Sequence, residues 1–450
     1  MRYLPHTPED IRAMLDAIGV ASVEELFAPI PQTLRDGAAL ELPEALDEQR
    51  LLQHISALAQ SNGTRSMKAS FLGAGVYDHF IPAVVPQLLS RSEFLTAYTP
   101  YQPELAQGTL QAIFEFQTHI SEVLQMEVAN ASMYDGAHAV AEAVLMSIRM
   151  ARNPRRVLLS SAVHPEYRAV TQTYLSHSPV ELLTIPTVNG RTALETLDEA
   201  DLSGVSMLLI QSPNFFGVIE DLQHCAAFCK KHGILLGVCF SEALAYGILQ
   251  PPGAFGADIV AGEGQSFGIP VGYGGPLVGL FATKMSNVRL MPGRLVSQST
   301  DTLGKPSYVL TLATREQHIR RARATSNICT NQALMALAAS IYLSLLGKRG
   351  FVELATINLA RAEYAKKALT AIPNVSLAHQ APTFNEFVLE LPRDAAQFVD
   401  FAAKEGIAAG VELGRFFSER SKQLLVTVTE NNSIEQIDAL AQLLRAFLAT

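Results

Sequence analysis

The sequence contains no tryptophan and only four cysteines in 450 residues. Scarce cysteines without framework spacing are typical of a protein kept in a reducing compartment, so we expect a cytoplasmic location. The amino terminus, MRYLPHTPED, lacks the apolar run of a signal peptide. The most apolar stretch, residues 333–347, is too short to span a bilayer and is predicted to be a buried helix. We therefore expect no membrane partner.

Charged residues are also few, at 17% of the chain, and acidic ones predominate to give a net charge of −9. An acidic chain disfavours nucleic acid as a partner. The hydrophobic content of 48% excludes a disordered protein. A chain of 450 residues can bury a large core and is expected to form two or three domains.

Short apolar segments alternate with helix-length segments through the middle of the chain. Strands are predicted near residues 157–161, 180–185, 205–210 and 234–239. Nearly continuous apolar strands between helices indicate an α/β fold with a mostly parallel sheet buried on both faces. The loops at the carboxyl ends of such strands form the ligand crevice.

The two ends of the chain have different patterns. Residues 1–60 predict a helical arm for dimerisation or docking, with capping pairs Thr7–Asp10 and Ser22–Glu25 and a third helix from Pro43 to about Ala59. The last eighty or so residues predict a small α+β domain, with strands near 384–391 and 423–429 and helices at 394–405 and 433–448. The expected domains are thus an arm (1–60), a large α/β domain (61–330), and a linking helix with a small domain (331–450).

Residues 258–284 contain six glycines between two apolar segments, near 258–261 and 277–282. The connection is too short for a crossover helix, so the two strands are predicted to be antiparallel. Clustered glycines let the backbone approach a ligand or another chain closely, or they simply permit a tight connection.

The segment TAYTPYQPE, residues 96–104, crowds aromatic and polar side chains between two prolines that exclude a continuous helix. It is either a surface turn or the wall of a binding site. The candidate site residues in it are Tyr98, Tyr101, Gln102 and Glu104.

Two further clusters are candidates for binding. The dense basic patch is either a solvated helix face or a contact for an acidic partner, and its candidate residues are Arg315, His318, Arg320 and Arg321. In HCAAFCKKH, Cys225 and Cys229 lie one helical turn apart beside His224 and His232. Two small sulfurs at this spacing suit the core face of a helix better than a metal site, so no metal is expected.

The glycine-rich stretch resembles glycine decarboxylase, the P-protein of the glycine cleavage system, a pyridoxal-phosphate enzyme that some organisms divide into two homologous chains. In the catalytic half, the loop reads His-Lys-Thr-Phe, then Pro, then glycines, and the lysine forms the Schiff base. Here Gln265, Ser266, Phe267, Pro270 and Gly272–Gly275 occupy that pattern, so Gln265 replaces the lysine. FLGAGVYDHFIP (71–82), TAYTPYQPE and ATSNICTNQAL (324–334) also resemble the amino-terminal half of this family, and the resemblance covers nearly the whole chain.

The resemblance implies the aminotransferase-like fold type I, a three-layer α/β/α arrangement, and the half of the enzyme without the cofactor lysine. The aspartate that holds the pyridinium nitrogen in such enzymes is replaced by Val238 or Cys239, with Glu242 a displaced substitute. Asp135, at a turn where related folds bind phosphate, either repels that anion or caps the helix. His164 either stacks on a ring or begins a helix before Pro165.

The function implied is that of subunit 1 of glycine dehydrogenase (decarboxylating). With a homologous subunit 2 that bears the pyridoxal phosphate, two copies of each, the complex decarboxylates glycine and transfers its aminomethyl group to the lipoyl arm of the H-protein. The segment with Tyr98 and Tyr101 would contribute to the partner's site. Alternatives are a regulatory homologue, or a self-sufficient pyridoxal-phosphate enzyme using Lys284 or Lys305.

Overall fold

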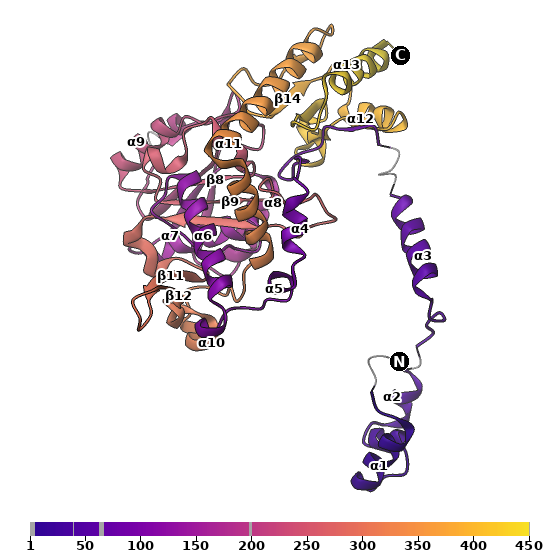
Figure 1. The fold of residues 1–450 in the computed structure, drawn as a ribbon. Helices are drawn as coiled ribbons and strands as arrows, with labels where there is room; N and C mark the ends of the chain where they lie inside the picture. Colours follow the sequence, from indigo (N-terminus) through magenta and orange to yellow (C-terminus); the bar gives the residue numbers. More distant parts are fainter. Residues whose placement is uncertain (1–4, 39, 63–66, 198–199, 450) are drawn as a thin grey trace. The chain divides into compact units, whose positions relative to one another are not determined.

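The computed structural model describes residues 5–38, 40–62, 67–197 and 200–449, and the chain divides into two compact units, Met1–Arg65 and Ser66–Thr450 (Figure 1). The first unit contains α1 (Pro8–Ile18), the 3₁₀ turn η1 (Val23–Phe27), α2 (Gln32–Asp36) and α3 (Glu48–Gln60).

The predicted helix start at Thr7 is confirmed, because Asp10 N donates to Thr7 Oγ1 and the Asp10 carboxylate accepts from Thr7 N. The second capping pair is wrong. Ser22 forms no cap, since the Glu25 carboxylate accepts from Ala21 N instead, and only a 3₁₀ turn follows. The third helix begins later than predicted, after Asp47.

No described residue of the first unit is buried. The exposed side chains include one apolar stripe on α3, with exposed fractions of 47% for Leu51, 61% for Leu52, 53% for Ile55 and 54% for Leu58. Residues three and four apart share a helix face, so these side chains form a continuous apolar surface of the kind that marks an interaction site.

The second unit is built on a seven-stranded sheet in the order β2-β10-β9-β8-β7-β3-β4. All pairings are parallel except those of β10, which runs antiparallel to both neighbours, as predicted for the pair β9–β10. The strands are β2 (Val128–Ala129), β3 (Arg156–Ser160), β4 (Glu181–Ile185), β7 (Val205–Gln211), β8 (Leu235–Phe240), β9 (Ile259–Glu263) and β10 (Gly279–Thr283).

Helices cover both faces of this sheet (Figure 1). Side chains that alternate along a strand point to opposite faces. Leu208 and Val238 therefore pack with α6 (Gln107–Leu124), α9 (Leu222–His232) and α11 (Ala333–Thr370). On the other face, Leu209 and Ala261 pack with α7 (Gly136–Met150) and α8 (Pro165–Leu175). The result is the expected three-layer α/β/α arrangement.

By length and composition alone, α11 is the one helix in the described part of the chain that could cross a membrane. It is interrupted at Gly347, where φ is 56° and ψ is −178°. Its first half buries Ala336, Ala339 and Tyr342 in the core with α6 and the sheet, which confirms the predicted buried helix over 333–347.

The carboxyl-terminal region forms a four-stranded antiparallel sheet, in the order β13-β14-β17-β16, with α12 (Ala395–Lys404) and α13 (Ile434–Ala449). Its strands are β13 (Ser376–Leu377), β14 (Glu386–Glu390), β16 (Val411–Glu412) and β17 (Gln423–Thr427). β1 (Ala69–Ser70) pairs with β15 (Ile407–Ala408), and Phe71 lies in the same core. Residues 69–71 thus pack with this region, although the predicted boundary places them in the large domain.

Two short hairpins and several short helices complete the unit. The hairpins pair β5 (Thr187–Val188) with β6 (Arg191–Thr192), and β11 (Leu295–Thr300) with β12 (Pro306–Thr311). The short helices are α4 (Val84–Leu89), α5 (Ser92–Leu95) and α10 (Gln317–Arg320). The β11–β12 hairpin was not predicted, because its polar residues lack a clear apolar alternation.

Candidate functional site

Buried polar side chains gather at the carboxyl ends of the parallel strands, where a ligand crevice is expected. They come from the ends of β7, β8 and β9, from the loop around residue 77, and from the start of β14. The cluster comprises Tyr77, His79, Gln211, Ser241, Glu242, Glu263, Gln265 and Glu386.

Gln265, which replaces the family's lysine, is 2% exposed and hydrogen-bonded through both ends of its amide. Its Oε1 accepts from Tyr77 N at 2.9 Å. Its Nε2 donates to the carbonyl oxygens of Tyr77 at 2.9 Å and Ile269 at 2.7 Å. Gln265 therefore links the loop around residue 77 to the segment that follows β9. This role needs both a donor and an acceptor, which a side-chain amide supplies.

Glu263, two residues earlier, places its carboxylate at the amino terminus of α7. Its Oε2 accepts from Gly136 N at 2.8 Å, while Oε1 accepts from the N–H groups of Gly264, Gln265 and Val278, each at 3.0 Å. Burial raises the pKa of Glu263 to about 8 against the lowering effect of these N–H groups. Two N–H groups that a phosphate would use at this helix terminus, those of Gly136 and His138, thus already donate to the chain's own side chains, Glu263 and Asp135.

Asp135 caps α7, as one of the two alternatives predicted. Its Oδ1 accepts from His138 N at 2.8 Å, and the carboxylate also contacts His138 Nδ1. The Asp135 carboxylate places a negative charge beside this helix terminus, which disfavours a bound anion there.

Val238 and Cys239, the two residues expected at the position of the pyridinium partner, are both buried in apolar clusters, so this position holds no acid. Cys239, at the end of β8, is buried in the apolar cluster with Ile259 and Ala261, and burial raises the pKa of its thiol well above the ordinary value. Glu242 is a carboxylate nearby, but its Oε2 faces His79 Nε2 at 2.9 Å and Asn385 Nδ2 at 3.0 Å.

His79 lies between two carboxylates. Its Nε2 contacts Glu242, and its Nδ1 is 2.9 Å from Glu430 Oε2. Burial alone would lower the pKa of His79, but the charges and hydrogen bonds of both carboxylates raise it to about 10. Burial raises the pKa of Glu430, but the hydrogen bond and charge of His79 lower it to about 2. The group is a carboxylate–imidazolium–carboxylate chain that ties residues 79, 242 and 430 together.

His164 begins a helix, the second of the two predicted alternatives. Its Nδ1 accepts from Glu166 N, and its Nε2 donates to the carbonyl oxygen of Ala74 at 2.8 Å. The ring stacks on Tyr167 with centroids 4.8 Å apart. Burial lowers the pKa of His164, so the imidazole is neutral near pH 7.

Neither alternative lysine lies in the crevice. Lys284 pairs with Asp258, which lies at the opposite, amino-terminal end of β9. Lys305 is exposed in the turn between β11 and β12. Lys284 and Lys305 are therefore unavailable for a Schiff base in this crevice.

The cysteines of α9 occupy the core face of the helix, as favoured above. Cys225 and Cys229 are buried, whereas His224 and His232 are exposed. Over the described residues, no group of three or more His, Cys, Asp or Glu side chains is placed to hold a metal ion.

The residues of the crevice do not fit pyridoxal phosphate. That cofactor needs an amine for its aldehyde, donors for its phosphate and, in this fold, an acid for its ring nitrogen. Here these positions hold the bonded amide of Gln265, the carboxylate of Glu263 and the apolar Cys239.

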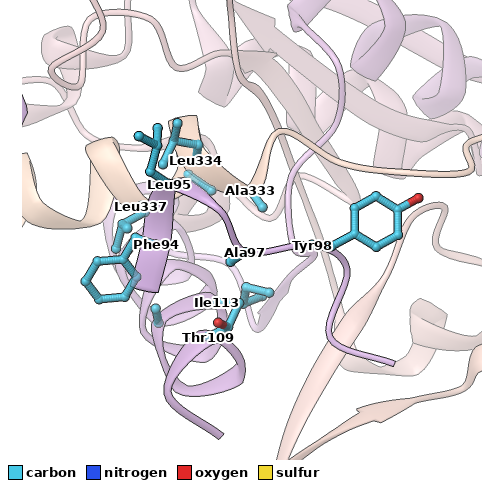
Figure 2. A pocket seen from close by; sticks show the side chains of 11 residues that line it. Phe94, Leu95, Ala97, Tyr98, Thr109, Ile113, Ala333, Leu334 and Leu337 are labelled. Carbon is cyan, nitrogen blue, oxygen red and sulfur yellow. The ribbon is translucent and has the colours of Figure 1, made fainter. Parts of the chain in front are cut away.

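The aromatic segment, residues 96–104, lies on the surface. Tyr98 is 77% exposed and Tyr101 is 51% exposed, and Gln102 and Glu104 are exposed too. Figure 2 shows the Tyr98 ring directed away from the small apolar pocket that its segment forms with α6 and α11. The Tyr98 hydroxyl is therefore presented outward, whereas Tyr101 Oη accepts from Arg294 Nη2 at 3.0 Å.

The predicted basic cluster divides in two. The Arg315 side chain points inward and donates to the carbonyl oxygens of Val288, Met291, Gly293 and Leu312. His318, Arg320 and Arg321 are exposed on and after α10. These three residues thus lie on the surface, whereas the Arg315 side chain is occupied by hydrogen bonds to backbone carbonyl oxygens.

Several residues of this region gave no signal in the sequence. The partners of His79 and Tyr77 lie more than 300 positions away, at Glu430 and Glu386. Arg294 is buried beneath the aromatic segment. Glu263 stands beside the glycine loop, and its acidic side chain next to the replaced lysine was the one available clue.

Three comparisons with known proteins agree with the fold and the motifs. Residues 1–444 match the family model of the glycine cleavage system P-protein. A Geobacillus kaustophilus protein named probable glycine dehydrogenase (decarboxylating) subunit 1 is 51% identical over 437 residues, 97% of this chain and 97% of that protein.

Solved structures extend the likeness to three dimensions. A crystal structure of glycine decarboxylase (P-protein) of the glycine cleavage system, in inhibitor-bound form, has a TM-score of 0.91 and 44% identity, covering 99% of this chain and 100% of that one. A sphingosine-1-phosphate lyase from Burkholderia pseudomallei, at 17% identity and a TM-score of 0.68 over 93% of this chain and 94% of that one, shows the fold alone. The fold is that of the type I pyridoxal-phosphate enzymes, and the chain belongs to the glycine cleavage system P-protein family.

Proposed function

We propose that this chain is the subunit of a two-chain glycine dehydrogenase (decarboxylating) that carries no cofactor. One observation carries the proposal: in a chain of this family, the side chain at the lysine position is an amide bonded at both ends, with a carboxylate filling the adjacent anion cradle. Relatives about half identical over nearly their full length are named subunit 1, which supports a second subunit.

In this proposal the pyridoxal phosphate resides on a homologous subunit 2, with two copies of each chain in a cytoplasmic complex. Bound there, the cofactor supplies the electron sink for glycine decarboxylation. The aminomethyl group passes to the lipoyl arm of the H-protein. The residues of this chain bind the partner subunit, and they exclude water and orient groups at the partner's active site.

The aromatic segment is the part we propose for the partner's site or the channel leading to it. Tyr98 and Tyr101 are exposed residues whose hydroxyls can each donate one hydrogen bond, although Tyr101 Oη also accepts from Arg294, and Glu104 can accept. Pro100 and Pro103 stiffen the backbone between them. His318, Arg320 and Arg321 are proposed to contact an acidic surface of the partner, and Arg315 holds the turn beside them.

Reconstitution from the separate subunits tests the function. Neither chain alone should decarboxylate glycine, and the mixture with H-protein should. Tyr98→Phe and Tyr101→Phe keep each ring and remove one hydroxyl, so each is expected to lower the rate about ten- to a thousand-fold in a normally assembled complex. Full activity in both variants would reduce the segment to a seal of the interface, and activity of the partner alone would remove the need for this chain.

A further inference from the structure

The aromatic segment and the basic loop, residues 316–323, meet at one buried arginine that no sequence pattern singled out. Arg294 is 5% exposed and directly precedes β11. Its Nη1 donates to Thr99 Oγ1 and its Nη2 donates to Tyr101 Oη, each at 3.0 Å. The guanidinium carbon also lies 5.3 Å from the centroid of the Tyr101 ring. One side chain therefore holds two of the nine residues of the segment.

The same guanidinium is linked to the basic loop. Arg294 Nε lies 3.5 Å from Glu316 Oε2, and both side chains are nearly buried. The same carboxylate oxygen is 3.6 Å from His318 Nδ1, and the His318 ring meets the edge of Tyr101 at 6.3 Å. Arg294, Glu316, His318 and Tyr101 thus close a ring of contacts between two segments about two hundred positions apart.

The base of the basic loop is fixed beside this ring. Arg315 donates to the carbonyl oxygens of Met291 and Gly293, next to Arg294 in sequence. Thr325 N donates to the Arg315 carbonyl oxygen at 3.1 Å, which closes the loop on itself. His318, Arg320 and Arg321 are consequently offered outward from an anchored turn, beside the exposed Tyr98 and Tyr101.

We propose that Arg294 is a positioning residue that makes the aromatic segment and the basic loop one preformed surface for the cofactor-bearing subunit. The proposal rests on the function proposed above. A surface of phenol hydroxyls beside cations fits a partner face rich in carboxylates. The planar guanidinium of Arg294 can donate to the hydroxyls of Thr99 and Tyr101 while it is paired with Glu316. The single ammonium of a lysine cannot reproduce these three contacts in the same geometry.

Fluorine NMR of the free chain tests the positioning itself. The twelve tyrosines are labelled as 3-fluorotyrosine, and the Tyr101 signal is assigned by its loss in Tyr101→Phe. In Arg294→Lys, we expect the Tyr101 signal to move to the position of a solvent-exposed tyrosine. Arg289→Gln, at an exposed arginine nearby, should leave it unchanged. An unmoved signal in a folded Arg294→Lys chain overturns the proposal.

Kinetics of the assembled complex test whether the positioning is used. Arg294→Lys should lower kcat about ten-fold or more with an unchanged KM for glycine, and Arg289→Gln should alter neither. The double variant Arg294→Lys with Tyr101→Phe should lose no more than the greater single loss, because both act through one contact. Additive losses, or full activity of Arg294→Lys, overturn it. If Tyr101→Phe is itself fully active, the proposed role of the segment fails, and the fluorine spectrum alone decides whether Arg294 holds it.

Discussion

At the scale of single residues, Gln265 and Glu263 turn a crevice that would hold a cofactor into a closed polar core. Gln265→Lys is the change that formally restores the family's lysine. We expect it to form no internal aldimine, because Glu263 still fills the anion cradle and Cys239 still replaces the acid. It should lower the free energy of unfolding by about 2–4 kcal/mol, since a buried ammonium cannot accept from Tyr77 N.

Urea unfolding and borohydride reduction with added pyridoxal phosphate check both parts of this expectation. Gln250→Lys, at an exposed glutamine, is the matched control and should leave the stability within about 0.5 kcal/mol of the parent chain. A pyridoxyl group on residue 265 of the variant would show that the lysine alone was missing.

The chain Glu242–His79–Glu430 predicts a definite pH dependence. The pKa of His79 is raised from 6.5 to about 10, so its stabilising effect is complete below pH 6.5 and is lost as the pH rises toward 10. The pKa of Glu430 is lowered from 4.5 to about 2, so its contribution is present above pH 4.5 and is lost as the pH falls toward 2. Both contributions to stability are therefore complete between pH 4.5 and pH 6.5.

His79→Gln removes the cation between two buried carboxylates and should cost about 3–5 kcal/mol near pH 6. The cost should shrink as the pH rises toward 10, because His79 then loses its proton in the parent chain as well. Unfolding curves of both proteins from pH 5 to 10 measure the difference. A difference that stays constant across this range would mean that His79 is neutral in the folded chain.

Single residues also show how far the sequence alone could reach. The caps at Thr7 and Asp135 were predictable, because a cap is a contact between residues three apart. The contact of His79 with Glu430 spans 351 positions and leaves no local pattern. Ser22 and Glu25 have the spacing of a capping pair, but the Glu25 carboxylate accepts from Ala21 N instead of Ser22 N. The sequence thus predicts contacts between residues close in the chain, but not contacts between residues that are far apart in it.

At the scale of elements, the alternation of apolar strands and helices was enough to predict the parallel sheet and the antiparallel β9–β10 pair. The pairing of β1 with β15 was not predictable, because two-residue strands carry no periodicity. The candidate site shows the same division. The glycine loop and the aromatic segment were visible as motifs, whereas their anchors, Tyr77 and Arg294, come from other elements.

The apolar stripe of α3 carries a prediction at this scale. Ile55→Asp should leave the melting temperature of the isolated chain unchanged, because the side chain is already 53% exposed. It should weaken assembly with the partner at least ten-fold if that stripe is buried there. Gln53→Asp, on the opposite face of α3, is the control. Equal affinities of the two variants, measured by analytical ultracentrifugation, would assign the stripe no part in assembly.

At the scale of the whole molecule, the chain keeps the fold of its enzyme family, and its own side chains fill the position of the cofactor. The apolar stripe of α3, the aromatic segment and the basic loop are its candidate contacts with a partner. An obligate interface of this kind buries on the order of 2,000–5,000 Å². Adding the partner should therefore raise the melting temperature of this chain.

The central claim, that the cofactor belongs to the partner and not to this chain, has one direct test. The assembled complex is saturated with pyridoxal phosphate, reduced with borohydride and digested, and the modified peptides are identified by mass spectrometry. We expect a pyridoxyl-lysine in the partner subunit and none in this chain, whether this chain is assembled or alone. A pyridoxyl-lysine at Lys284, Lys305 or any other lysine of this chain, formed in proportion to activity, would contradict it.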